Sequence, residues 1–299
     1  MERIYPSKIL IAGEYTVLNG SGALLIPYKS SFIQWKKQGQ RSDEHLMAFF
    51  DYLSKHEVLK DFVDLSQMKT IIEESWYLDG TIPLGYGLGS SGAVTAAVWD
   101  RFRLHGVTEI SVGETLEVFK MMESFFHGKS SGLDPLVSFY QLPVYARDEK
   151  IELLKDFDLD SMLPSGLALL DSGQARQTQK GVNWFQQQRQ HQDFREQIDD
   201  LSKINQRIIQ SMIKRDTITF EECWKWISQI TMQLFRPLIP DPVYYIWKEG
   251  LQSETYYLKL CGAGGGGYFV VYCNDHNYFH KICTLNQLKW IQVSGEGID

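Results

Sequence analysis

Residues 84–97 read Leu-Gly-Tyr-Gly-Leu-Gly-Ser-Ser-Gly-Ala-Val-Thr-Ala-Ala, so that three alternating glycines and a pair of serines precede a run that reads as a helix. Small residues let backbone N–H groups point toward a ligand, and a helix start adds unpaired N–H groups and the positive end of its dipole. The sequence therefore predicts an anion site here, with an oligophosphate as its natural guest. A tight strand-to-helix turn is the alternative, and the adjacent serines make it less attractive.

This loop differs from two common phosphate-binding motifs. It lacks the Gly-Lys-Ser/Thr triplet of a Walker A loop, and no acidic residue stands where a dinucleotide fingerprint needs a ribose partner. A second cluster, Gly262-Ala263-Gly264-Gly265-Gly266-Gly267, nominally fits Gly-x-Gly-x-x-Gly but joins two predicted strands. Ordering so many glycines costs entropy, so we expect this cluster to approach a ligand closely rather than to form only a flexible hairpin.

Length and charge exclude several classes of protein. The chain has 299 residues, 43% of them hydrophobic, and a net charge of −7, which argues against nucleic-acid or anionic-membrane binding. A polyphosphate must therefore be held by local donors and a metal ion. No apolar run is long enough to span a bilayer, no signal peptide is evident, and the four cysteines lack metal-site spacing. We expect free thiols and a cytoplasmic protein.

Hydrophobic spacing predicts a mixture of helices and strands, and hence an α+β fold. Residues 8–18 read as a strand, a glycine-centred turn and a further apolar segment. Further strands are expected at residues 23–35, 68–79, 166–171, 255–261 and 268–273. Helices are expected at residues 43–60, 91–104, 112–126, 179–215, 220–235 and 242–252, the second capped by Ser90 or Ser91 and the third begun by a Ser111/Glu114 capping box. We expect two domains, residues 1–160 and 161–299, with a boundary near residues 150–165.

Four residues have the chemistry that phosphoryl transfer from ATP requires. Such a reaction needs a cation between the phosphates and a group beside the acceptor hydroxyl. Glu123, near the end of a predicted helix, is a candidate Mg²⁺ ligand together with Ser91. Asp134, in a loop rich in serine and glycine, is a candidate to accept or orient the hydroxyl proton. Lys8, placed near Asp134, would stabilise the transferring phosphate and keep Asp134 ionised.

Together these segments resemble the GHMP kinase superfamily, which includes galactokinase, homoserine kinase, mevalonate kinase and phosphomevalonate kinase. Lys8 to Gly20, Leu84 to Ala97 and Leu260 to Phe269 are similar to its three motifs, in the same order. Glu123 to Asp134 is most similar to the mevalonate kinases, in which a metal-binding glutamate is followed by His-Gly and Pro-Ser-Gly-x-Asp. Here Ser130 stands in place of the proline.

The resemblance implies a two-domain GHMP kinase fold. Its N-terminal domain would be ribosomal protein S5 domain 2-like, with a left-handed βαβ unit, and its C-terminal domain ferredoxin-like. The implied activity is ATP-dependent transfer of the γ-phosphate to the primary hydroxyl of mevalonate, in isoprenoid biosynthesis, with Mg²⁺ as cofactor.

The resemblance also assigns roles to residues. Lys8 and Asp134 would be catalytic, and Ser91 and Glu123 would hold the metal ion. Arg176 is a candidate partner for a substrate carboxylate, and Thr178 would touch substrate or phosphate. The ATP phosphates would lie on Gly85, Gly87, Leu88, Gly89, Ser90 and Ser91, and the substrate contacts would come from Glu14, Tyr15, Arg176, Thr178 and Gly264.

Two departures keep the acceptor open. Mevalonate kinases usually read Gly-Glu-His in the first motif, whereas this chain has Tyr15, and Gly92 replaces an alanine of the second motif. Both features are typical of phosphomevalonate kinases, which are the second candidate, and homoserine or sugar acceptors are further alternatives. A diphosphomevalonate decarboxylase fits less well. From another class, a nucleotide-binding regulatory protein without turnover is opposed by the intact set of Lys8, Ser91, Glu123 and Asp134.

Three features receive no catalytic role. His127 is expected only to end its helix, and His276 and His280 share a helix face without a third metal ligand, so surface or packing roles are expected. The polar outer face of the helix predicted at residues 179–215 is a candidate contact with a second subunit, and a homodimer is an open possibility; a solvated face is the simpler interpretation.

Overall fold

The computed structural model describes residues 3–37, 43–104, 110–148, 150–157 and 166–293. These residues form two compact units. Unit 1 comprises residues 1–9, 25–83 and 89–144, and unit 2 comprises residues 10–24, 84–88 and 145–299. The boundary predicted between residues 160 and 161 lies outside the described residues, and the predicted division at that point stays a prediction.

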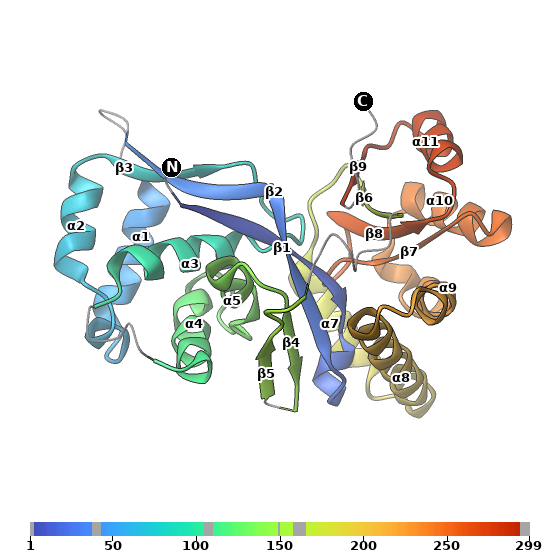
Figure 1. The fold of residues 1–299 in the computed structure, drawn as a ribbon, viewed down its shortest axis with the longest axis horizontal. Coiled ribbons are helices and arrows are strands. Elements are labelled where there is room, and N and C mark those ends of the chain that lie inside the picture. The colour runs from blue at the N-terminus through green and yellow to red at the C-terminus, as the bar shows by residue number, and fades with distance from the viewer. Residues whose placement is uncertain (1–2, 38–42, 105–109, 149, 158–165, 294–299) are drawn as a thin grey trace. The chain divides into compact units, whose positions relative to one another are not determined.

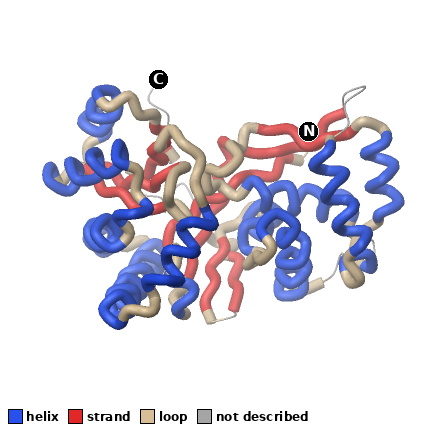
Figure 2. The backbone as a smooth tube through the Cα atoms, turned by 180° about the vertical axis from the view of Figure 1, so that it is seen from behind, coloured by secondary structure: helices blue, strands red, loops and turns tan. Residues whose placement is uncertain are grey.

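Unit 1 combines strands with a layer of helices. Its strands come from β1 (Ile4–Ala12), β2 (Ala23–Lys37) and β3 (Trp76–Gly80), of which β1 and β2 continue into unit 2. β2 pairs antiparallel with β3. In Figures 1 and 2 the helices of this unit lie on one side of these strands. The helical elements are α1 (Glu44–Lys55), η2 (Leu59–Asp61), α2 (Leu65–Glu73), α3 (Ser90–Phe102), α4 (Val112–His127) and α5 (Leu133–Tyr140).

Local sequence explains where these helices begin and end. Ser111 and Glu114 form the predicted capping box of α4, and Gly128 follows its last residue, as expected. The strand predicted at residues 68–79 is wrong in its first half, where α2 forms instead. Asp64 caps α2 by accepting a hydrogen bond from the backbone N–H of Gln67, and Met68 and Ile72 bury one helical face.

Unit 2 contains a four-stranded antiparallel sheet in the order β7-β8-β6-β9. With helices between its first and second and its third and fourth strands, it follows the β-α-β-β-α-β order typical of ferredoxin-like folds. The resemblance of the other domain to ribosomal protein S5 domain 2 stays a prediction. The strands of this sheet are β6 (Leu167–Asp171), β7 (Tyr256–Leu260), β8 (Tyr268–Cys273) and β9 (Trp290–Gln292).

The helices of unit 2 pack on this sheet and on one another: α9 and α10 contact β7, and α8 contacts α9 and η1. They are η1 (Thr16–Asn19), α7 (Thr178–Gln188), α8 (Gln192–Lys214), α9 (Thr217–Leu234), η4 (Arg236–Leu238), α10 (Asp241–Ser253) and α11 (His276–Leu285). Two further strands, β4 (Val144–Arg147) and β5 (Lys150–Leu153), extend the β1-β2 sheet in the order β1-β2-β4-β5.

The single long helix predicted at residues 179–215 is wrong, because α7 and α8 are separated at residues 189–191. The guanidinium of Arg195 donates to the backbone carbonyls of Arg189 and Gln190, at 3.0 Å each, and thereby satisfies acceptors that the interruption leaves free. Neither glycine nor proline marks this break.

The four cysteines are free and buried, and no helix among the described residues has the length and apolar character of a membrane span.

Candidate active site

A lysine and an aspartate of unit 1 form an ion pair. The Nζ atom of Lys8, on β1, lies 3.3 Å from Oδ2 of Asp134, in the first turn of α5. The Lys8 side chain is only 6% exposed, whereas that of Asp134 is 26% exposed, so the carboxylate retains access to a substrate. The element that carries Asp134 is fastened to the strand that carries Lys8, because Ser138 on α5 donates a 2.7 Å hydrogen bond to the Pro6 carbonyl.

Two glycines of the loop allow this pair to form. A Cβ atom added to Gly89 would lie 3.0 Å from Oδ2 of Asp134 and from two carbons of Lys8, and Gly89 has a positive φ of 75°. A Cβ added to Gly92 would lie 2.7 Å from the Cβ of Asp134 and 2.8 Å from its carbonyl carbon. Because real side chains do not tolerate such contacts, α3 approaches α5 this closely only with glycine at position 92.

The N-terminus of α3 has no side-chain cap. Gly89 is the N-cap residue, which corrects the expectation that Ser90 or Ser91 caps this helix. The first N–H groups of a helix have no partner within it, so those of Ser90 and Ser91 remain available. Free N–H groups and the positive end of a helix dipole favour an anion, and this helix start lies beside Lys8 and Asp134, which a Cβ on Gly89 would contact.

The hydroxyl of Ser91 forms hydrogen bonds with side chains of α4. It donates to Oε1 of Glu123 at 3.0 Å, and it lies 2.9 Å from Nε2 of His127. Because a hydroxyl has one proton, Nε2 of His127 is the donor when Glu123 accepts that proton. The other carboxylate oxygen of Glu123 accepts from the hydroxyl of Ser130. Ser91 therefore contacts two polar side chains of α4, and Ser130 of the following loop contacts one of them, Glu123.

Glu123 lies in an environment that disfavours its charge. Its side chain is buried, and burial raises the pKa of the Glu123 carboxyl to about 7, with the neighbouring charge of Asp134 acting in the same direction. The hydrogen bonds from Ser130 and Ser91 and the charge of Lys8 oppose this shift. A buried carboxyl with few compensating charges has a strong affinity for a cation.

The donor set suits magnesium. Glu123, Ser91 and Ser130 present carboxylate and hydroxyl oxygens, and hard oxygen donors are what Mg²⁺ prefers. No group of three or more His, Cys, Asp or Glu side chains among the described residues could hold a metal ion. An ion here would therefore complete its coordination with water and phosphate oxygens, as Mg²⁺ commonly does.

The first part of the glycine loop belongs to unit 2, where it packs backbone to backbone against two other loops. The backbone N–H of Arg176 donates to the Gly85 carbonyl at 2.9 Å, and that of Tyr268 donates to the Tyr86 carbonyl at 3.1 Å. A Cβ on Gly87 would lie 2.7 Å from the carbonyl oxygen of Cys261. Leu88 is buried. In the second glycine cluster, a Cβ on Gly266 would lie 2.6 Å from the Ala175 carbonyl oxygen and one on Gly267 would lie 2.7 Å from that of Tyr86, so close packing within the chain accounts for these two glycines.

Glu14 and Tyr15, predicted to contact substrate, are both held by groups of unit 2. The carboxylate of Glu14 forms a buried ion pair with Lys259 on β7. The hydroxyl of Tyr15 donates to the Ala263 carbonyl at 2.6 Å, and its ring stacks on Phe185 with centroids 4.5 Å apart. These contacts fix the segment that follows β1, and substrate contact by Glu14 and Tyr15 stays a prediction.

The remaining predicted residues are distributed around the same loops. Arg176 lies beside two glycines, since a Cβ on Gly262 would be 2.7 Å from its Nη1 atom and one on Gly87 would be 3.4 Å away. Thr178 is exposed at the first residue of α7. Gly264, at φ 68°, lies next to Leu238 of η4. Their roles toward a substrate stay predictions.

Comparison with known proteins supports the sequence resemblance. Residues 53–141 match the family described as GHMP kinases N terminal domain, a range that contains the glycine loop, Glu123 and Asp134. The crystal structure of the Methanococcus jannaschii mevalonate kinase is 17% identical, with a TM-score of 0.65 over 97% of this chain and 96% of that one. The chain resembles the GHMP kinases in sequence and in fold.

Two further relatives show how far this GHMP kinase likeness extends. A mevalonate kinase of Archaeoglobus fulgidus is 24% identical over 141 residues, which are 45% of this chain and about half, 49%, of that protein. The Streptococcus pneumoniae phosphomevalonate kinase structure is 15% identical, with a TM-score of 0.66 over 97% of each chain. Structures of both acceptor classes therefore share this fold.

Sequence reasoning missed three residues that contact the predicted site residues. His127 was expected only to end α4, yet it contacts Ser91. Ser130, noted only as a departure from the family pattern, donates to Glu123. Lys259 lies in the strand predicted at residues 255–261 and was given no role of its own; a lysine between two leucines, in Tyr-Tyr-Leu-Lys-Leu, was the available signal.

Proposed function

We propose that this chain is an ATP-dependent kinase that transfers the γ-phosphate to the primary hydroxyl of mevalonate, a step of isoprenoid biosynthesis. The observation that carries the proposal is the Lys8–Asp134 pair beside the uncapped N-terminus of α3. Ser91 on α3 and Glu123 on α4 are hydrogen-bonded to each other at the same end of α3. An anion site, a general base and a carboxylate suited to a cation are the parts that phosphoryl transfer needs.

Each residue has a defined task in this reaction. The N–H groups at the start of α3 bind phosphate oxygens, and Gly85, Gly87 and Leu88 give the loop the shape to approach them. Asp134 accepts a hydrogen bond from the acceptor hydroxyl, orients it toward the γ-phosphate and takes up its proton. Lys8 stabilises the negative charge that develops on the transferring group and keeps Asp134 ionised.

Ser91 and Glu123, with Ser130 behind them, are the residues that would hold Mg²⁺. The ion would neutralise charge on the phosphate oxygens and orient them for in-line transfer. His127 fixes the orientation of the Ser91 hydroxyl and so determines where its lone pairs point. Arg176 is a positive group available for a substrate carboxylate, and Glu14, Tyr15, Thr178 and Gly264 complete the proposed substrate contacts.

Phosphomevalonate is the second candidate acceptor, on the grounds of Tyr15 and Gly92. Both departures have packing reasons in this chain, since Gly92 permits the contact of α3 with α5 and Tyr15 donates to the Ala263 carbonyl. Neither residue therefore requires a phosphorylated acceptor. The Glu123–Asp134 segment, which is most similar to mevalonate kinases, favours mevalonate.

An ADP-release assay with ATP and Mg²⁺ tests the proposal, with mevalonate and 5-phosphomevalonate offered separately. Turnover with mevalonate and not with the phosphorylated acceptor supports the proposed function. Turnover with 5-phosphomevalonate alone replaces mevalonate by the second candidate. If neither acceptor is used, homoserine and a panel of sugars follow, and absence of all acceptor-dependent ADP release would favour a regulatory nucleotide-binding protein.

A further inference from the structure

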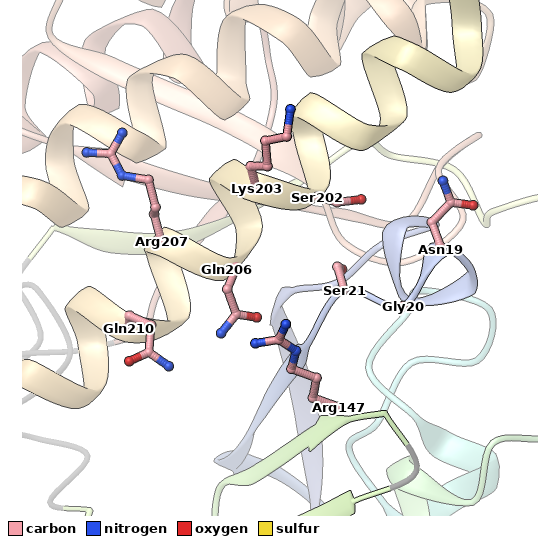
Figure 3. Close-up of a pocket in the computed structure, with 9 residues that line it drawn as sticks. All are labelled: Asn19, Gly20, Ser21, Arg147, Ser202, Lys203, Gln206, Arg207 and Gln210. Atoms are coloured by element: carbon pink, nitrogen blue, oxygen red, sulfur yellow. The ribbon is translucent and has the colours of Figure 1, made fainter. Parts of the chain in front are cut away.

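Unit 2 contains a pocket built from residues to which the proposed kinase reaction gives no role. It has a volume of about 410 Å³ and lies among η1, β4 and α8. Figure 3 shows its lining: the end of η1 and the following turn on one side, β4 on another and a face of α8 on the third. The residues that line it are Asn19, Gly20, Ser21, Arg147, Ser202, Lys203, Gln206, Arg207 and Gln210.

The charged residues that line the pocket are cations, and three neighbouring aspartates contact lining residues. Arg147, Lys203 and Arg207 contribute three cations, and no Asp or Glu is among the lining residues. This contrasts with the chain as a whole, which has a net charge of −7. Asp148, Asp199 and Asp200 contact Arg147, Asn19 and Lys203, so an anion in the pocket competes with these carboxylates for the cations.

The floor of the pocket is held in place by close packing. Gln206 on α8 donates a 3.1 Å hydrogen bond to the hydroxyl of Tyr145 on β4. A Cβ on Gly22 would lie 2.7 Å from the Tyr145 ring and 2.9 Å from Oε1 of Gln206, so both side chains occupy space that only glycine leaves open. Asn205 ties α8 to η1 through a 2.7 Å hydrogen bond to Thr16.

Hydrogen-bonding groups in the pocket remain unused. Arg147 contacts the carboxylate of Asp148 through Nε, at 3.2 Å, and its two terminal nitrogens have no partner among the described residues. Figure 3 shows this guanidinium extending from β4 toward the amide of Gln206. The amide of Gln210 also has no partner in the described part of the chain, and Oε1 of Gln206 is buried without a donor there.

The other two cations are only weakly engaged. Lys203 pairs with Asp200 at 2.7 Å, with both side chains largely exposed, and the guanidinium of Arg207 lies 5.1 Å from the ring centre of Trp226. Exposed ion pairs contribute little, because water and salt screen them. A doubly charged ligand would therefore compete successfully with the aspartates for these side chains.

We propose that this pocket binds a small organic phosphate that carries hydroxyl groups. Arginine and amide donors match the acceptor oxygens of a phosphate, and the carbonyl oxygen of the Gln210 amide can accept a hydrogen bond from a ligand hydroxyl. The volume exceeds that of a free phosphate ion and is at the lower end of the range typical of small-molecule sites, which leaves room for a few carbon atoms.

Glycerol 3-phosphate is a suitable probe, with inorganic phosphate and glycerol as its two halves. Titration of the full-length, ¹⁵N-labelled chain, without ATP or metal, should shift the amide signals of Gly20 and Ser21 and the side-chain signals of Gln206 and Gln210 in a saturable way. Glycerol 3-phosphate should bind more tightly than inorganic phosphate, and glycerol alone should not bind. Signals of Ser90 and Ser91 report separately on the anion site of α3.

Variants assign the binding to this pocket. Arg147→Gln should weaken the affinity for glycerol 3-phosphate about tenfold, because a charge-assisted pair of hydrogen bonds is lost. Gln210→Leu, an uncharged change that leaves the packing of Gly22 intact, should weaken it less and serves if Arg147→Gln unfolds the chain. Lys281→Gln on α11 removes an equal charge outside the pocket and should leave the affinity unchanged.

The pocket is disproved as a phosphate site if the Gly20 and Ser21 signals do not shift saturably. It is equally disproved if Arg147→Gln and Lys281→Gln weaken binding to the same extent, since that would indicate general attraction by charge. The titration requires no turnover, so its failure leaves the proposed kinase activity untouched, and failure of the kinase assay leaves this site untouched.

Discussion

The Nε2 atom of His127 lies 2.9 Å from the hydroxyl oxygen of Ser91, while that same hydroxyl donates to Glu123. The last residue of α4 therefore determines the orientation of a side chain in the first turn of α3. A histidine that the sequence suggested only as a helix terminator becomes a positioning residue for the proposed metal ligand.

His127→Phe should raise the KM for Mg·ATP about three- to tenfold, because this fold-change corresponds to the net free energy of one hydrogen bond. The change in kcat should be smaller. Binding of Mn²⁺ to the protein–nucleotide complex, measured by electron paramagnetic resonance, should weaken in parallel. His127→Gln keeps a donor and should restore most of the affinity. His45→Phe, on the exposed face of α1, is the matched control. Equal effects of His127→Phe and His127→Gln would contradict the positioning role.

Asp134→Asn should reduce kcat about 10²- to 10⁴-fold, because the amide cannot accept the hydroxyl proton. ATP binding, measured by calorimetry, should be nearly unchanged, since the phosphate-binding groups belong to α3 and its loop. Asp79→Asn, which breaks an exposed ion pair with Lys36, should leave kcat as it is. Retained turnover in Asp134→Asn would remove the proposed base.

The pH dependence of stability should report on Glu123. The folded-state pKa of this carboxyl is about 7, above its ordinary value of 4.5, so its contribution to stability is complete below pH 4.5 and is lost as the pH rises through 7. In urea unfolding without metal, Glu123→Gln should therefore gain stability relative to the native chain between pH 5 and pH 8. A difference between the two proteins that does not change with pH would mean that Glu123 titrates normally.

Gly92→Ala should destabilise the chain by about 1–3 kcal/mol, because the added methyl group overlaps the backbone of Asp134. It should also lower kcat, since relief of the overlap moves Asp134 away from Lys8. Gly113→Ala is the control within α4, where an added Cβ would meet only the hydroxyl of Ser111, at 3.9 Å, and should stabilise by about 0.5–1 kcal/mol. Thermal unfolding of both variants separates a steric effect from a general one.

Lys259→Met should cost about 3–5 kcal/mol, because it leaves the buried carboxylate of Glu14 without a counter-charge. The double variant Lys259→Met/Glu14→Gln should recover a large part of this loss. Breaking the more exposed pair of Lys225 and Glu254 with Lys225→Met should cost at most about 1 kcal/mol. An equally small loss for Lys259→Met would show that the buried pair contributes no more than a surface pair.

Much of the fold could be predicted from local sequence patterns, and part of the site from the family resemblance. The alternation of strands and helices and the capping box at Ser111 were predicted from local sequence and are present in the structure. The pairing of Lys8 with Asp134 was implied by the resemblance, and the structure contains this ion pair. These features depend on short-range signals or on motifs that keep their spacing, which is why the sequence alone was sufficient.

The features that were missed depend on partners distant in the chain. The interruption between α7 and α8 is stabilised by Arg195, and no glycine or proline signals it. Lys259 has its partner at Glu14, 245 residues away, and a lysine in a strand ordinarily predicts an exposed position. The direct hydrogen bond between Ser91 and Glu123 was not predicted, and their role as metal ligands stays a prediction.

The way the chain is divided between the two units limits how it can be cut. Residues 10–24 and 84–88 belong to the same unit as residues 145–299. A fragment that stops at residue 160 would retain Glu14 and Tyr15 but would lose Lys259 and the Ala263 carbonyl, their hydrogen-bond partners. Such a fragment would expose an orphaned charge and an unsupported aromatic ring, so truncation at the apparent midpoint should yield aggregation-prone material rather than an autonomous nucleotide-binding module.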